Sequence, residues 1–224
     1  MYQEFAFIYD RLMEDFPYKD YQIRVLEFIK PEGKLLEIGC GSGRMTSFFF
    51  QAGTQVHGLD LSLPMLSLAK RRLPKVNFYQ GRLEDLSLGK FNQIFACVDV
   101  LNYYTSIEEL RAFFLSIKDH LCGEFFFDLR HPSDMVEELA DKVFFYEEEE
   151  ADLVWINEKD GELLYQDLVI YWKEDGGYRK TSEEHIQRMW SMEEVEGLLM
   201  ELGFVIKKKN ETKERIFYLC GLTA

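Results

Sequence analysis

A glycine-rich stretch at residues 35–43, Leu-Leu-Glu-Ile-Gly-Cys-Gly-Ser-Gly, is the part of the sequence whose residue types most clearly suit chemistry. A short apolar run ends in the carboxylate of Glu37, three glycines follow at alternate positions, and Met45, Phe48 and Phe49 then recur at helical spacing. Glycine lets the backbone approach a ligand closely, and the first turn of a helix offers free N–H groups. A strand, a glycine loop and a helix in this order predict a nucleotide-like ligand.

Two common nucleotide-binding loops do not fit this stretch. A P-loop needs a lysine and a hydroxyl residue after its last glycine to hold phosphates, but Arg44 and Met45 follow Gly43. A dinucleotide loop has the spacing G-x-G-x-x-G, and Arg44 occupies the place of its third glycine. The carboxylate of Glu37 would also repel a pyrophosphate, whereas it suits a ligand with an ammonium and a sulfonium group. A tight turn that binds no ligand is the alternative interpretation.

A second acidic position follows the loop at the distance expected for a ribose contact. Residues 55–60 predict a strand that ends in Asp60, about 20 residues beyond the loop, where nucleotide-binding folds hold ribose hydroxyls. A carboxylate can accept two hydrogen bonds from a cis-diol. Ser62 is a typical N-cap for the helix that follows, with Pro64 in its first turn. We therefore expect Asp60 to bind ribose; the alternative is that it only ends the strand.

With these features the sequence resembles the class I S-adenosylmethionine (SAM)-dependent methyltransferases, particularly the small bacterial ones with a single methyltransferase domain. The resemblance spans about residues 20–130 and rests on the glycine loop, on Asp60, and on the segments 81–86 and 98–103. It implies an α/β fold, with a Rossmann-like, seven-stranded, mostly parallel sheet, and SAM as the cofactor. The segment Phe5–Met13 resembles the N-terminal lid of that group, in which an aromatic side chain often closes over the cofactor.

The resemblance also implies which residues contact the cofactor. In the family, the segment after the third strand holds adenine with a backbone N–H and usually an acidic side chain. Arg82 stands where the acid is commonest, so we assign this contact to the N–H of Leu83, with Glu84 as the second candidate. The predicted cofactor-binding residues are Tyr9, Glu37, Gly39, Cys40, Gly41, Ser42, Asp60, Leu61, Met65, Leu83, Glu84, Val98 and Asp99.

The elements that must position these residues alternate along the chain as in a doubly wound sheet. A first helix is expected over residues 21–29, and the pairs Ser106/Glu109 and Ser191/Glu194 are capping boxes that begin two further helices. Strands are expected at 34–38, 55–60, 76–80, 91–98, 123–129, 204–208 and 215–221, one of the last two antiparallel.

Residues 143–190 interrupt this alternation. They contain several β-like runs separated by turn signals such as Asp175-Gly-Gly177, which predicts an antiparallel insertion. We place the insertion beside the cofactor, where the family recognises its acceptor; an edge sheet or a dimer contact is the alternative. The run Glu147–Glu150 is expected to form a solvated edge that blocks strand pairing. We therefore predict one methyltransferase domain over residues 1–224, with a helical lid over about 1–30 and a β-hairpin insertion over about 143–190.

Composition restricts the partners and the compartment. The chain has 26 Lys and Arg against 40 Asp and Glu, a net charge of −14, which argues against nucleic acid as a partner. The four cysteines form no C-x-x-C pair, so we expect buried free thiols in a reducing cytosol and no metal site. No signal peptide and no apolar run of about 18 residues is present, which predicts a cytoplasmic protein without a membrane partner. The oligomeric state is left open.

Because the methyl group of a sulfonium is already activated, the protein mainly needs to orient the reactants and exclude water. Catalytic side chains are therefore left unassigned, and the acceptor-binding candidates are Tyr103, Arg130 and His185. Arg130 either binds an acceptor carboxylate or forms a surface ion pair. His185 either serves as a base or is exposed to solvent. If Ile186 and Trp190 face the core, His185 lies on the opposite face of its strand. The predicted function is methyl transfer to O or N of a small molecule. The alternatives are a SAM-binding sensor or assembly module and an NAD(P)-dependent oxidoreductase.

Overall fold

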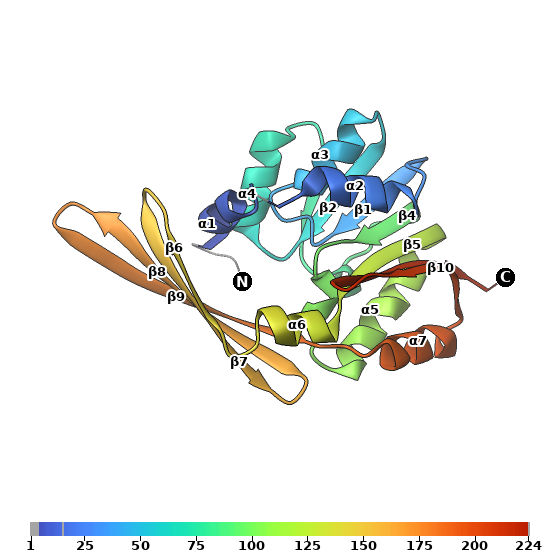
Figure 1. Ribbon diagram of the computed structural model, residues 1–224. Helices are drawn as coiled ribbons and strands as arrows, with labels where there is room; N and C mark the ends of the chain where they lie inside the picture. The colour runs from blue at the N-terminus through green and yellow to red at the C-terminus, as the bar shows by residue number, and fades with distance from the viewer. Residues whose placement is uncertain (1–4, 15, 224) are drawn as a thin grey trace.

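The computed structural model describes residues 5–14 and 16–223, and its centre is a seven-stranded sheet in the order β10-β11-β5-β4-β1-β2-β3 (Figure 1). β1 to β5 pair in parallel, and β11 is antiparallel to both of its neighbours. The chain reverses direction across the sheet between β1 and β4, so a crevice opens at their carboxyl ends, where such folds bind ligands. The strands are β1 (Lys34–Ile38), β2 (Gln55–Asp60), β3 (Asn77–Gln80), β4 (Phe91–Ala96), β5 (Leu121–Arg130), β10 (Phe204–Glu211) and β11 (Arg215–Leu222).

Helices cover both faces of this sheet, which is why its strands are apolar on both sides. Leu35 and Phe126 belong to the core under α2 and α3, whereas Leu36 and Phe127 belong to the core under α5 and α7. The helices are α1 (Phe5–Leu12), α2 (Tyr18–Leu26), α3 (Arg44–Gln51), α4 (Leu63–Arg72), α5 (Ile107–His120), α6 (Pro132–Glu138) and α7 (Met192–Glu201), with two 3-10 turns, η1 (Leu83–Asp85) and η2 (Val100–Tyr103).

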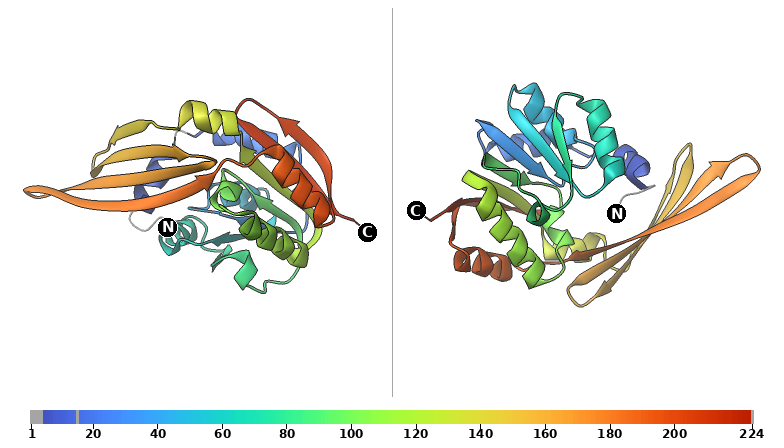
Figure 2. Two further views of the ribbon diagram at one scale, coloured as in Figure 1. Left: turned by 90° about the horizontal axis from the view of Figure 1, so that it is seen from below. Right: turned by 180° about the vertical axis from the view of Figure 1, so that it is seen from behind.

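The insertion is a separate antiparallel sheet of four strands. Figures 1 and 2 show it as a long twisted ribbon that projects from the main body, with α1 between it and α4. Phe5 and Ile8 of α1 pack with Leu153 and Ile170 on the inner face of this sheet. The strands are β6 (Val143–Glu147), β7 (Ala151–Asp160), β8 (Leu163–Glu174) and β9 (Gly177–Arg188).

The predicted fold class is confirmed, since the mostly parallel sheet and the antiparallel insertion are both present. Both capping boxes form, with Ser106 and Ser191 accepting from the backbone N–H groups of Glu109 and Glu194. The first predicted helix is displaced along the chain, because α2 begins at Tyr18 and ends at Leu26. Within the described ranges no helix is long and apolar enough to cross a membrane.

Two smaller predictions are wrong. Cys122 is exposed, although the other three thiols are buried as expected. The glutamate run is not an edge: only Glu147 belongs to a strand, and the other three connect β6 to β7. Arg11 of α1 forms ion pairs with Glu148 at 3.1 Å and Glu150 at 3.2 Å, so this connection helps to hold α1 on the insertion.

Candidate functional site

The loop between β1 and α3 has three glycines in the left-handed region, and the space beside them differs. A Cβ on Gly39 would lie 2.4 Å from a methyl of Val100, and one on Gly43 would lie 3.2 Å from the Cβ of Ala69. A Cβ on Gly41 would meet nothing within 4 Å. Two of the glycines are therefore needed for packing, whereas Gly41 leaves an open cradle that a ligand can enter.

Asp60 at the end of β2 holds this loop in place. Its Oδ2 accepts the N–H of Gly41 at 2.8 Å, and its Oδ1 accepts the N–H of Ser62 at 2.8 Å. Burial raises the pKa of Asp60, although these hydrogen bonds oppose the shift. Because two carboxylate oxygens have about four acceptor sites, the carboxylate can still accept a hydrogen bond from a ribose hydroxyl after these bonds form.

A cavity opens beside the loop at the carboxyl ends of β1, β2 and β4, and we call it the first cavity. It brings together eight of the thirteen predicted cofactor contacts. These eight are Tyr9, Gly39, Gly41, Asp60, Leu61, Met65, Leu83 and Val98. The other described residues that line it are Ile38, Leu59, Gly81, Arg82, Val100, Tyr103 and Tyr104. The predicted contacts outside this lining are Glu37, Cys40, Ser42, Glu84 and Asp99.

Glu37 is buried behind the glycine loop. The hydroxyl of Thr46, on α3, donates a hydrogen bond to its Oε2. Burial raises the pKa of Glu37 to about 8, the hydrogen bond from Thr46 opposes this shift, and the charge of Asp60 adds to it. The side chain of Glu37 supports the loop from inside the protein and does not line the first cavity. Its contact with the cofactor therefore remains a prediction.

The raised pKa of Glu37 predicts how stability depends on pH. The unfolded chain releases the proton near pH 4.5 and the folded chain near pH 8, so its stabilising contribution is complete below pH 4.5 and is lost as the pH rises to about 8. A Glu37→Gln variant has no carboxyl group at this position, so it does not show this loss of stability with rising pH. Thermal unfolding should show a gap between the variant and wild type that widens from about pH 4.5 to about pH 8 and then stays constant.

Glu109→Gln is the control for this experiment, because hydrogen bonds from Thr105 outweigh its slight burial and lower the pKa of Glu109. The difference in thermal stability between Glu109→Gln and wild type should stay constant above pH 6. Parallel pH curves for Glu37→Gln and wild type would contradict the assignment.

Helix α1 joins the glycine loop to the insertion. Asp10 accepts hydrogen bonds from the hydroxyl of Ser42 and from Arg44 at 2.8 Å, and it pairs with Arg72 of α4 at 3.1 Å. These partners lower the pKa of Asp10, although burial opposes them. At the start of the helix, the N–H of Phe5 donates to Glu183 of β9 at 3.1 Å. Ser42, a predicted cofactor contact, is thus used to fasten α1. Asp10 was not among the predicted site residues, and its only signal in the sequence is its place beside Tyr9.

The segment after β3 places Leu83 and Arg82 on the first cavity, but not Glu84. The guanidinium of Arg82 lies 5.5 Å from the centre of the Tyr104 ring, so the two side chains form one wall. Tyr104 was also not among the predicted site residues, although its position next to Tyr103 could have indicated it.

A second cavity adjoins the first, and Tyr9, Val98 and Tyr103 line both. It contains more empty space, about 1980 Å³ against about 840 Å³, and the insertion contributes part of its wall. The second cavity also contains Asp99, Arg130 and His185. Asp99 was predicted as a cofactor contact, but it lines the second cavity and not the first.

The two remaining acceptor candidates are both engaged with acids. The Nε of Arg130 lies 2.7 Å from Asp134, one turn along α6, which agrees with the ion-pair alternative. His185 is buried, its Nε2 is 3.5 Å from Glu183, and its ring centre is 6.0 Å from that of Tyr103. The solvent-exposed alternative for His185 is therefore wrong.

Ile186 does not face the core, since this side chain is 40 % exposed. The inner face of β9 turns toward the second cavity, so His185 and Gln187 point inward and Ile186 points out. Trp190, beyond the end of β9, is buried as expected.

Comparisons with known proteins agree with this geometry. A family model described as a methyltransferase domain matches residues 35–122. The chain is 27 % identical over 219 residues to the putative methyltransferase YqeM of Bacillus subtilis (strain 168), which covers 93 % of this chain and 88 % of the relative. This chain also superposes with a TM-score of 0.81 on the crystal structure of a SAM-dependent methyltransferase from Clostridium acetobutylicum ATCC 824. The two are 26 % identical, and the match covers 99 % of this chain and 98 % of that one. The chain belongs to the class I SAM-dependent methyltransferases.

The cofactor of this methyltransferase is therefore SAM, and the first cavity fits it. The open cradle at Gly41, the carboxylate of Asp60 and the aromatic wall of Tyr9 and Tyr104 suit an amino acid, a ribose and a base. Membership of this family also excludes the oxidoreductase alternative.

Some relatives of the methyltransferase have a named acceptor, and these match a smaller part of the chain. The dTDP-3-amino-3,4,6-trideoxy-alpha-D-glucopyranose N,N-dimethyltransferase of Streptomyces venezuelae is 35 % identical over 88 residues, which cover 39 % of this chain and 37 % of that relative.

Proposed function

We propose that this enzyme transfers a methyl group from SAM to a nitrogen or oxygen of a small molecule bound in the second cavity. The observation that carries the proposal is the common boundary of the two cavities, formed by Tyr9, Val98 and Tyr103. A cofactor in the first cavity and an acceptor in the second can meet at this boundary. In-line displacement requires such a meeting.

The residues around the boundary have separate roles in this mechanism. SAM supplies an activated methyl group when it is bound. Asp60 and the backbone of Leu83 hold the ribose and the base, and Gly41 gives the amino-acid part its room. Tyr9, which is partly buried against the insertion, helps to exclude water from the boundary. Orientation of this kind can lower a barrier by about 7–11 kcal/mol without a catalytic side chain.

A base is needed only for an acceptor that must lose a proton. His185 lines the second cavity, where its imidazole can meet an acceptor, and its Nε2 lies 3.5 Å from Glu183. We therefore propose His185 as the residue that receives a proton when the acceptor requires it.

The proposal includes a small-molecule acceptor, a cytoplasmic location, and no nucleic acid or membrane partner. The net charge of −14 opposes binding to phosphate backbones. The cysteines are free, and three of the four are buried, as suits a reducing compartment.

Isotope transfer tests the proposed function. The purified enzyme is incubated with SAM carrying a ¹³C-methyl group and with a metabolite extract, and new ¹³C-methyl signals are recorded by NMR. We expect signals that depend on the enzyme and belong to small molecules. Tight SAM binding in calorimetry without any transfer would contradict the proposal and favour a SAM-binding sensor or assembly module.

A further inference from the structure

The backbone after β4 is strained where the two cavities meet. Val98 has a φ of 62° and Asp99 a φ of 66°, both in the left-handed region. A β-branched residue such as valine is a true outlier there. Strain of this kind persists only where the surroundings impose it, and it often accompanies a functional site.

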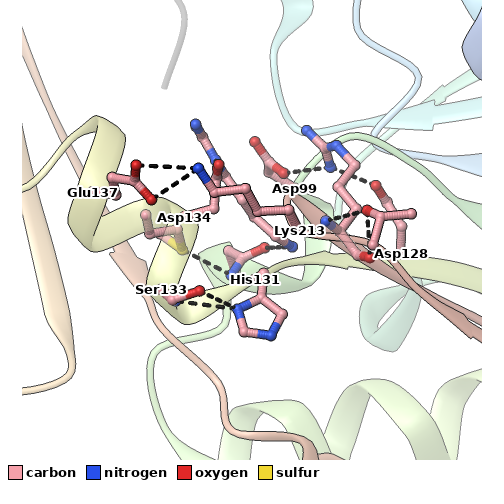
Figure 3. A network of polar contacts seen from close by, with 12 residues as sticks. Asp99, Asp128, His131, Ser133, Asp134, Glu137 and Lys213 are labelled. Atoms are coloured by element: carbon pink, nitrogen blue, oxygen red, sulfur yellow. Dashed lines mark hydrogen bonds and ion pairs between the residues drawn. The ribbon is translucent and has the colours of Figure 1, made fainter.

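Two groups from neighbouring strands, the buried Asp128 and the partly buried Arg215, impose this conformation. Asp128 of β5 accepts the N–H of Val98 at 2.8 Å. Arg215, at the start of β11, donates to Asp99 Oδ1 at 2.7 Å and also to Asp128 Oδ2. In Figure 3 the carboxylates of Asp99 and Asp128 lie on either side of the guanidinium group that joins them. The turn is thus locked from two strands, and the position of the Asp99 carboxylate is defined.

The charge of this cluster is not balanced. One guanidinium faces two carboxylates, so a negative charge remains when both are ionised. Asp128 is fully buried, whereas 17 % of the Asp99 side chain is exposed in the second cavity. Solvent or a ligand can therefore reach this charge only at Asp99.

The surroundings of Asp99 favour a cation. Tyr9 and Tyr103 line the same cavity, and aromatic faces attract ammonium groups. Two cationic side chains of the cavity are paired with acids, Arg130 with Asp134 at 2.7 Å and Lys213 with Glu137 at 3.1 Å (Figure 3). These pairs weaken their attraction for an anionic ligand.

We propose that Asp99 binds the amino group of the acceptor and makes this methyltransferase specific for amines. The proposal rests on the proposed function and narrows its acceptor class. A bound ammonium gives one proton to His185 or water, and its nitrogen lone pair then forms the N–C bond. The C–S bond of the cofactor breaks, and its electron pair stays on sulfur. The methylated product is an ammonium ion that the Asp99 carboxylate stabilises.

The isotope experiment separates this proposal from the one it rests on. Chemical shifts distinguish ¹³C-methyl groups on nitrogen from those on oxygen. We expect methyl groups on nitrogen with the wild-type enzyme. Methyl groups on oxygen alone would overturn the amine proposal and leave the proposed function intact, whereas no transfer at all would overturn both.

An Asp99→Asn variant tests the residue itself. The substitution should lower kcat/KM for the amine acceptor about 10- to 100-fold, mainly through a higher KM. The reason is that it removes a charged hydrogen-bond partner of the acceptor's amino group. Binding of SAM, measured by calorimetry, should change less than twofold. Asp99→Glu should recover part of the loss, and Asp167→Asn, an equal change of charge on the exposed face of β8, should have no effect. An unchanged KM in a folded Asp99→Asn variant would overturn the role of Asp99.

Discussion

A Gly41→Val variant is expected to fold and to lose measurable SAM binding. Gly41 lines the first cavity, and a Cβ there would meet no protein atom within 4 Å. The added side chain therefore projects into the space that the cofactor needs. Its φ of 51° adds backbone strain of about 1–2 kcal/mol, which a domain stable by about 5–15 kcal/mol tolerates. Circular dichroism checks the fold, and titration calorimetry with SAM checks binding.

Gly161→Val is the matched control for this variant. Gly161 lies in the turn between β7 and β8, has a φ of 58°, and also has open space around its Cβ position. It reproduces the strain of Gly41→Val away from the first cavity, so its affinity for SAM should equal that of wild type. If Gly41→Val kept its affinity as well, the close approach of the ligand to this glycine would be refuted.

An Asp60→Ala variant should bind SAM about 10- to 100-fold more weakly, a loss of about 1.5–3 kcal/mol. The substitution removes the carboxylate oxygens left for the ribose diol. It also frees the N–H of Gly41, which Asp60 now holds at 2.8 Å, so part of the loss comes from the loop.

A SAM analogue without ribose hydroxyls separates these two contributions. Wild type should bind the analogue more weakly than SAM, whereas Asp60→Ala should bind the two about equally. A variant that still preferred SAM as strongly as wild type does would show that Asp60 only orders the loop.

The glycine loop shows how far local sequence can predict a site. Alternate glycines after an apolar strand predict left-handed backbone and close approach, and all three glycines have positive φ. The pattern cannot say which glycine faces the ligand. That depends on Val100 and Ala69, which are distant in sequence and fill the space beside Gly39 and Gly43.

The acceptor side was less predictable because strands far apart in sequence meet there. Asp99 was assigned to the cofactor from its place after β4, but Arg215, 116 residues away, ties it to the second cavity. His185 was placed on the face of its strand opposite Ile186, on the condition that Ile186 faces the core. The structure buries His185 and exposes Ile186, because the inner face of β9 borders the second cavity.

The sequence by itself determined the order of strands and helices, the capping boxes, the glycine loop and the carboxylate after β2. These features depend on periodicity and on interactions between residues close in the chain, so they can be recognised from residue types alone. Only the tertiary structure decided that Glu37 and Ser42 support the loop from inside, that α1 is fastened by Asp10, and that Asp99 faces the second cavity. Those outcomes depend on which side chains from distant elements compete for the same space and the same charges.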